Sequence, residues 1–208
     1  MFNFQALILS APAILFGLTI HEFSHGWVAW QLGDPTAKMM GRLTLNPLKH
    51  LDPIGTIALF LFRFGWAKPV PIDPRNFRHP TRDMAISSLA GPAANLLTAA
   101  VAGLILRVLI LFHVGGFIAT LISYFVLFNL ILCFFNLLPI PPLDGSRLLY
   151  HLLPPDLAAG YARLERYGFI ILIGIIFLGQ LTGINLLWLY MDPLLRIFSL
   201  IFVGRQII

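Results

Sequence analysis

Charged side chains are scarce in this sequence, at 11% of its 208 residues, whereas 58% of the residues are hydrophobic. Soluble domains carry about 25% charged and about 45–50% apolar residues. The chain therefore has too few charges to coat a globule in water, and its hydrophobicity excludes intrinsic disorder. One cysteine excludes an internal disulfide framework. What is left is a multi-pass membrane protein, which at this length we expect to form a single domain over residues 1–208.

Acidic residues are the rarest charged group. Nine Asp and Glu stand against fourteen Lys and Arg, and only two of the acids, Glu22 and Glu165, are glutamates. The net charge of +5 therefore reflects the small number of Asp and Glu residues more than a large number of Lys and Arg. In a membrane protein such an excess is typical of loops that face the cytosol, so no nucleic-acid partner is expected.

Long apolar runs predict four transmembrane helices. A helix rises about 1.5 Å per residue, so about 20 apolar residues cross a hydrocarbon core of about 30 Å. Four runs reach this length: residues 4–32, 86–112, 117–138 and 168–190. Two shorter runs, 54–66 and 193–203, each contain an arginine and predict re-entrant or interfacial segments.

The connection between the first two predicted spans is too long to be a simple loop. Residues 41–51 alternate in polarity and then reach the turn signal Asn46-Pro47, which predicts a short strand or hairpin. The predicted fold class is therefore an all-α polytopic membrane protein with a small membrane-associated β hairpin or sheet after the first helix.

The basic residues predict an orientation. Eleven of the fourteen lie in two connections, between the first and second spans and between the third and fourth. The opposite connection, residues 113–116, has none. The positive-inside rule makes the side with eleven basic residues cytoplasmic. We therefore expect a multi-pass protein of the cell (plasma or inner) membrane.

Residues 21–25, His-Glu-Phe-Ser-His, carry the chemistry. On a helix, His21 and His25 share one face and can hold one zinc ion, and Glu22 is placed to act on a water at that ion. Ionisable groups inside an apolar run are costly and are usually functional. The motif predicts a zinc site with Glu22 as its catalytic acid/base.

Catalytic zinc usually takes three protein ligands, so a third residue is needed. Asp144 is the best candidate because it follows the cytosolic end of the third span, on the side where the histidines lie. Asp192 is excluded because it falls on the far side. Asp52 stays open as a rival, although a turn role fits its place before Pro53 better.

These motifs resemble the site-2 protease family of intramembrane zinc metalloproteases. The resemblance rests on His21 to His25 inside the first span and on N-x-x-P-x-x-x-x-D-G from Asn136 to Gly145. Gly91-Pro-Ala-Ala-Asn95 also resembles the G-x-x-x-N element of that family. We expect a minimal form without a PDZ or CBS module.

The resemblance implies that His21, His25 and Asp144 bind one zinc ion per chain and that Glu22 is catalytic. It implies that Asn95 lies near the active site and supports the substrate or the oxyanion. Asn136 is expected to position the proline-rich turn that carries Asp144, as indirect support for a metal ligand.

The predicted function is hydrolysis of peptide bonds in transmembrane segments of membrane-protein substrates, as in regulated intramembrane proteolysis, with the active site toward the cytosol. The expected partners are that substrate and the lipid bilayer. Two alternatives stay open. A zinc transporter or sensor would keep the ligands without needing Glu22 as a base. A catalytically inactive relative would bind membrane helices only.

Overall fold

The regular structure is helical throughout residues 4–62, 65–183 and 185–207, which the computed structural model describes; side chains of residues 4–7, 59–62 and 180 are outside that description. The elements in chain order are α1 (Phe4–Gln31), α2 (Thr36–Met39), η1 (Pro47–Lys49), α3 (Pro53–Phe62), η2 (Pro74–Asn76), α4 (Pro80–Leu111), α5 (Gly116–Asn136), α6 (Asp144–Leu152), α7 (Pro155–Leu164), η3 (Glu165–Tyr167), α8 (Gly168–Thr182) and α9 (Leu186–Val203).

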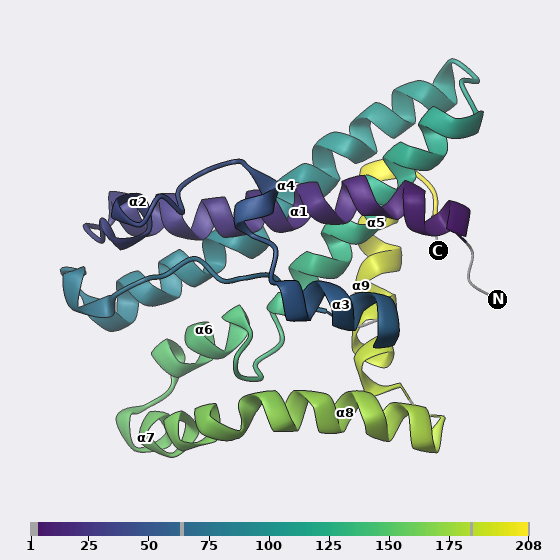
Figure 1. The fold of residues 1–208 in the computed structure, drawn as a ribbon. Coiled ribbons are helices and arrows are strands. Elements are labelled where there is room, and N and C mark those ends of the chain that lie inside the picture. Colours follow the sequence, from purple (N-terminus) through teal and green to yellow (C-terminus); the bar gives the residue numbers. More distant parts are fainter. Residues whose placement is uncertain (1–3, 63–64, 184, 208) are drawn as a thin grey trace.

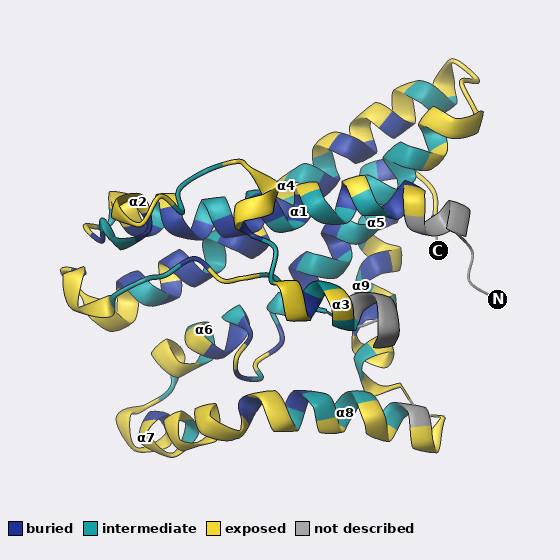
Figure 2. Ribbon diagram, viewed as in Figure 1, coloured by how far each residue is buried: buried dark blue, intermediate teal, exposed yellow. Residues whose placement is uncertain are grey.

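Helices α1, α4 and α5 pack against one another, and α9 packs on α4 and α5 (Figure 1). Buried apolar side chains of α4, α5 and α9 form the main hydrophobic cluster, with Leu106, Leu130 and Leu195 fully buried. Burial follows the facing sides of these helices (Figure 2). Small residues allow the close approach, because a Cβ at Gly103 would lie 2.6 Å from Phe202 Cβ.

Three helices among the described residues are long and apolar enough to cross a membrane, and the predicted number of four is wrong. They are α4, α5 and α9. Helix α1 forms over the predicted span 4–32, but it is not one of the three. The side chains of α1 are described from residue 8 onward. Over that part of the helix His21, Glu22 and His25 lower the mean hydropathy below that of α4, α5 and α9. Helix α3 has ten residues, about half the length needed to cross.

The predicted span 168–190 is also wrong, because a break divides it. Gly183 ends α8 in the left-handed conformation at φ 74°. Asn185 then begins α9, since its side chain accepts a hydrogen bond from the Trp188 backbone N–H at 3.0 Å. These are standard helix stop and start signals. The segment 193–203, predicted to be re-entrant or interfacial, instead belongs to α9, which continues through Pro193.

The predicted β hairpin over residues 41–51 does not form. Thr44 Oγ1 accepts from the Asn46 N–H at 3.2 Å, and Asn46 Oδ1 accepts from the Leu48 N–H at 3.1 Å. Such local bonds compete with a strand ladder, and Pro47 offers no N–H. In the described part of the chain, the β-type pairing that forms is a single antiparallel bridge between Leu51 and Ala67.

The turn before α6 is held from two sides. Helix α6 packs on α4, and α8 begins directly against the proline-rich turn. A Cβ at Gly168 would lie 2.3 Å from the Pro141 carbonyl oxygen, so α8 can begin there only with glycine. Leu138, Leu143 and Leu172 form a small buried cluster at this junction. The junction fixes where the first residue of α6 points.

Candidate metal centre

His21 and His25 face one another on α1. They lie one helical turn apart, their ring centroids are 4.5 Å apart, and the rings are nearly perpendicular. Both side chains are buried, and their Nε2 atoms are 3.0 Å apart. The i, i+4 spacing therefore brings the two nitrogens together, as the sequence predicted.

Asp144 completes the cluster from a distant part of the chain. It is the first residue of α6, and its Oδ2 lies 3.1 Å from His21 Nε2 and 3.2 Å from His25 Nε2. Gly145 makes this approach feasible, because a Cβ there would lie 2.2 Å from the Leu137 carbonyl oxygen. Among the described residues, the three side chains form a group able to hold one metal ion.

The hydrogen bonds of the two Nδ1 atoms decide which nitrogens can bind a metal. His25 Nδ1 lies 2.7 Å from the Ser87 carbonyl oxygen, which can only accept, so this nitrogen carries the proton. His21 Nδ1 lies 2.6 Å from Asn95 Oδ1 and donates to it. In the neutral form of each ring, Nε2 is then the nitrogen without a proton, which is what zinc requires of a histidine ligand.

The donor set fits zinc. Two Nε2 lone pairs and a carboxylate oxygen lie 3.0–3.2 Å apart. Ligands at about 2.0–2.2 Å around a tetrahedral zinc ion are about 3.3–3.6 Å from one another, slightly more than the separations seen here. Asp144 Oδ2 is also buried, with no hydrogen-bond donor among the described residues. Three lone pairs that converge in a buried place need a cation between them.

Helix α4 closes one side of the cluster through Gly91. A Cβ at this position would lie 2.4 Å from His25 Nε2 and 2.7 Å from His21 Cε1. No side chain larger than hydrogen leaves room for the two imidazoles. Gly91 is the first residue of the sequence motif that ends at Asn95, and the two imidazoles are the physical reason for glycine there.

Glu22 is held by a segment far away in the sequence. Its Oε2 accepts a hydrogen bond from the Val70 backbone N–H at 2.8 Å, and both residues are buried. Val70 lies in the non-helical segment 67–73, which we call the strap. Because Glu22 comes three positions before His25, one helical turn places its side chain beside that histidine.

Asp34 anchors the far end of the strap. It is fully buried beyond the end of α1, and its carboxylate accepts from the Asp73 N–H at 2.8 Å, from Asn76 Nδ2 at 2.8 Å and from Thr36. Burial alone would raise the pKa of Asp34, but the hydrogen bonds outweigh burial and lower it. At neutral pH the anchor is therefore an ionised carboxylate.

The other residues singled out in the sequence lie as follows. Asn95 is fully buried next to His21. Asn136 Nδ2 donates to the Leu132 carbonyl oxygen at 2.9 Å, at the end of α5. The rival ligand Asp52 caps the beginning of α3, where its Oδ1 accepts from the Gly55 N–H at 2.7 Å, and the ligand group does not include it.

Sequence reasoning missed three contacts. Ser87 contacts His25 through its backbone carbonyl oxygen, which every residue type has. Val70 contacts Glu22 through its backbone N–H, which every residue type except proline has. Asn129 was missed as well, although a buried amide in an apolar helix is a signal that could have found it.

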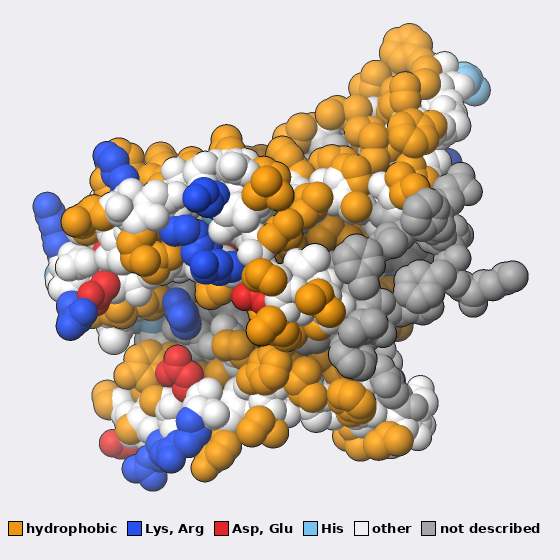
Figure 3. All heavy atoms as spheres, viewed as in Figure 1, with side chains coloured by type: hydrophobic (Ala, Val, Ile, Leu, Met, Phe, Trp, Pro, Cys, Tyr) orange, Lys and Arg blue, Asp and Glu red, His pale blue; other side chains and the backbone are white. Residues whose placement is uncertain are grey.

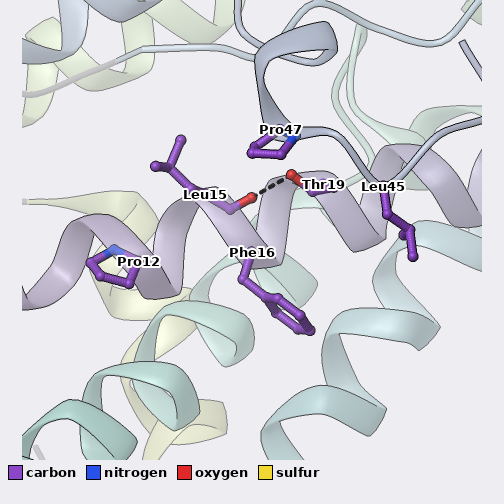
Figure 4. Close-up of a pocket in the computed structure, with 6 residues that line it drawn as sticks. All are labelled: Pro12, Leu15, Phe16, Thr19, Leu45 and Pro47. Atoms are coloured by element: carbon purple, nitrogen blue, oxygen red, sulfur yellow. Dashed lines mark hydrogen bonds between the residues drawn. The ribbon is translucent and has the colours of Figure 1, made fainter.

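A separate groove runs along α1 (Figure 4). It has a volume of about 230 Å³ and is lined by Pro12, Leu15, Phe16, Thr19, Leu45 and Pro47. Thr19 Oγ1 donates to the Leu15 carbonyl oxygen, so the wall is essentially apolar. Thr19 is two positions before His21, about 200° around the helix, so the groove faces away from that histidine.

Comparisons with known proteins agree with this centre. The family model described as peptidase family M50 matches residues 111–178. The "Putative zinc metalloprotease YwhC" of Bacillus subtilis (strain 168) is 40% identical over 202 residues, which cover 91% of this chain and 90% of that protein.

More distant relatives carry a similar name. The "Putative zinc metalloprotease Rip2" of Mycolicibacterium smegmatis is 33% identical over 177 residues, which cover 80% of this chain and 65% of that protein. Its Mycobacterium tuberculosis (H37Rv) counterpart is 29% identical over 174 residues, with 81% and 66% covered. No solved structure gives a significant match. The chain belongs to peptidase family M50, the site-2 protease family, and is a zinc metalloprotease.

Proposed function

We propose that this zinc metalloprotease hydrolyses peptide bonds within transmembrane segments of other membrane proteins. The observation that carries the proposal is the depth of the centre along α4, which is one of the candidate spans. Gly91, which lies against both histidine rings, comes five positions after Ile86, where the apolar run 86–112 begins, and this corresponds to about 8 Å along the helix. The centre therefore lies about a quarter of the way into a hydrocarbon core of about 30 Å.

In this proposal His21, His25 and Asp144 hold the zinc ion. Bound there, zinc lowers the pKa of water and polarises the carbonyl of the peptide bond. Glu22 takes the proton from the attacking water and passes it to the leaving amine. Its Oε2 is fixed by the Val70 N–H, so Oε1 is the oxygen that takes up the proton.

We also propose that Ser87, Asn95 and Asn136 hold the zinc-binding residues in place. The Ser87 carbonyl oxygen and Asn95 orient the two histidines, each through Nδ1. Asn136 lies at the end of α5, just before the turn to Asp144, and we assign it to stabilising that turn. Orientation of the ligands matters about 10–100-fold in metal affinity in other zinc sites.

The same proposal places the centre toward the cytosolic side of the cell membrane. Lys and Arg side chains gather at the left of Figure 3, over α2, the segment after it and α7. The hairpin between α4 and α5, at the opposite end, is mainly hydrophobic in that view. The positive-inside rule then assigns the basic end to the cytosol.

Orientation is tested by thiol labelling. In a Cys133→Ala background, Arg75→Cys should react with a membrane-impermeant reagent only when the cytosolic face is exposed. His113→Cys, in the α4–α5 hairpin, is the matched control and should react only from outside. Labelling of both cysteines from the same face would overturn the orientation.

Proteolysis is tested with the two glutamates. Purified protein is reconstituted into liposomes with a panel of single-span membrane proteins. Glu22→Gln should bind zinc but release no fragments, whereas Glu165→Gln, on the exposed η3 turn, should cleave like wild type. If wild type and Glu22→Gln release the same fragments, Glu22 is not the catalytic acid/base. If wild type cleaves only soluble peptides, the membrane substrate is wrong.

A further inference from the structure

Asn129 is a fully buried amide in the middle of α5, and it contacts the hydrogen-bond partner of a metal ligand. Its Oδ1 lies 2.9 Å from Asn95 Nδ2, and its Nδ2 donates to the Phe125 carbonyl oxygen at 2.8 Å. Asn95 in turn bonds to His21. Three side chains on three helices, α5, α4 and α1, therefore form one chain of hydrogen bonds.

The direction of this chain is fixed by two backbone carbonyls. The Phe125 carbonyl oxygen can only accept, so the NH2 end of Asn129 must point to it and the oxygen end to Asn95. Asn95 Nδ2 then donates one hydrogen to Asn129 Oδ1 and the other to the Gly17 carbonyl oxygen at 3.0 Å. Its Oδ1 is left to accept from His21 Nδ1, so the metal-binding Nε2 has no proton.

We propose that Asn129 is a positioning residue of the zinc centre, which acts through Asn95 to set the tautomer and the ring orientation of His21. Asn129 touches neither the metal ligands nor the substrate. The inference rests on His21 as a zinc ligand, as assigned in the proposed function, and it does not depend on which substrate is cleaved.

The same bonds give Asn95 a role different from substrate support. Both of its amide hydrogens and its oxygen are engaged, and the residue is fully buried. An amide without a spare donor cannot stabilise an oxyanion unless it breaks one of these bonds. Asn95 therefore contributes through His21.

The Asn129 side chain packs tightly against Gly17 of α1. A Cβ at Gly17 would lie 3.0 Å from Asn129 Oδ1 and 2.8 Å from Leu132 Cδ1. Glycine at position 17 thus gives space for the amide and supplies the carbonyl that Asn95 needs. Three helices meet at this point with polar groups that satisfy one another, and such networks specify one arrangement.

The test measures zinc affinity without substrate, by competition with a chelator in detergent. Asn129→Leu roughly keeps the volume of the side chain but removes the acceptor, so one hydrogen of Asn95 Nδ2 loses its partner and only the Gly17 carbonyl oxygen still holds that end of the amide. We expect zinc affinity to fall about 10- to 100-fold. The visible absorption of the cobalt-substituted protein should also change, because the orientation of His21 changes.

Two variants of matched design complete the test. Asn129→Asp, when the buried carboxyl is protonated, keeps one acceptor and one donor and should stay much closer to wild type than Asn129→Leu. Ser123→Ala removes a bond of the same i−4 type from α5, where Ser123 Oγ donates to the Ala119 carbonyl oxygen, and should leave zinc affinity unchanged.

Wild-type affinity in folded Asn129→Leu would overturn the inference. If that variant does not fold, Gly17→Ala decides, because its Cβ displaces Asn129. Weakened zinc binding by Gly17→Ala supports the inference, and unchanged binding overturns it. Loss of zinc by His21→Ala is measured in parallel, so a wrong ligand assignment is distinguished from a wrong role for Asn129.

Discussion

Glu22 and Val70 are 48 positions apart in the sequence, yet the Glu22 carboxylate and the Val70 backbone N–H are 2.8 Å apart in the fold. The bond links α1, which carries both histidines, to the strap. The Glu22 carboxylate is therefore held by a segment that belongs neither to α1 nor to α4, and in the proposed mechanism the strap orients the catalytic group.

Removing the Val70 N–H should slow catalysis without removing zinc. Val70→Pro lacks the donor, and a hydrogen bond to a charged group contributes about 1.5–3 kcal/mol. We expect kcat to fall about 10- to 150-fold with little change in KM. Val70→Ala keeps the N–H and serves as the control. Equal kcat values for the two variants would show that this bond does not orient Glu22.

A methyl group at position 91 should eject the metal. The Cβ of Gly91→Ala would lie 2.4 Å from His25 Nε2, so the imidazoles must move apart. We expect zinc affinity to fall by about 100-fold or more, measured by metal analysis after dialysis against a weak chelator. Gly160→Ala, where a Cβ meets open space on α7, should keep full zinc and be neutral or slightly stabilising.

Acid should weaken the anchor of the strap. The folded-state pKa of Asp34 lies below its ordinary value of 3.8, so its contribution is complete above that pH and is lost as the pH falls through the lower folded value. Asp34→Asn should cost about 1–3 kcal/mol at neutral pH. The gap to wild type should close below about pH 3.8 in thermal unfolding measurements.

Thr36→Val provides the matched comparison for Asp34. It keeps the carboxylate but removes one hydroxyl donor, so it should lose only part of the stabilisation and show a weaker dependence on pH. A gap between wild type and Asp34→Asn that stays constant into strong acid would mean that the ionised form is not what anchors the strap.

Removal of zinc should lower the stability of the fold around α1, α4 and α6. A ligand that binds only the folded state at 100 times its Kd stabilises by about 2.7 kcal/mol. We expect a chelator to lower the Tm of wild type and to leave the Tm of His25→Ala unchanged. The same drop in both proteins would show that the chelator acts elsewhere.

Much of the centre could be predicted from the sequence because its chemistry is local. His21, Glu22 and His25 fall within one and a half helical turns, so their shared region follows from helix geometry. Asp144 came from topology, and the structure brings it to 3.1 Å from His21. The predicted family and its zinc ion are confirmed.

The errors in the fold come from local signals that hydropathy averages out. Gly183 and Asn185 split an apolar run that looks continuous over a window of 20 residues. Asn46 and Pro47 turn an alternating stretch into a capped turn. In each case a few hydrogen bonds from a side chain to the nearby backbone outweigh a pattern read over a longer stretch.

The bond between His25 and Ser87 has a consequence for how variants of this protein are read. The acceptor is the main-chain oxygen of residue 87, so any amino acid at that position still supplies it. A scan of side-chain replacements at residue 87 will report on the hydroxyl, which donates to the His25 carbonyl oxygen at 3.2 Å, and not on the main-chain oxygen that accepts from His25 Nδ1. One of the two histidine Nδ1 bonds therefore cannot be removed by substituting a side chain, whereas replacing the amide after residue 87 by an ester in a semisynthetic protein would weaken that acceptor.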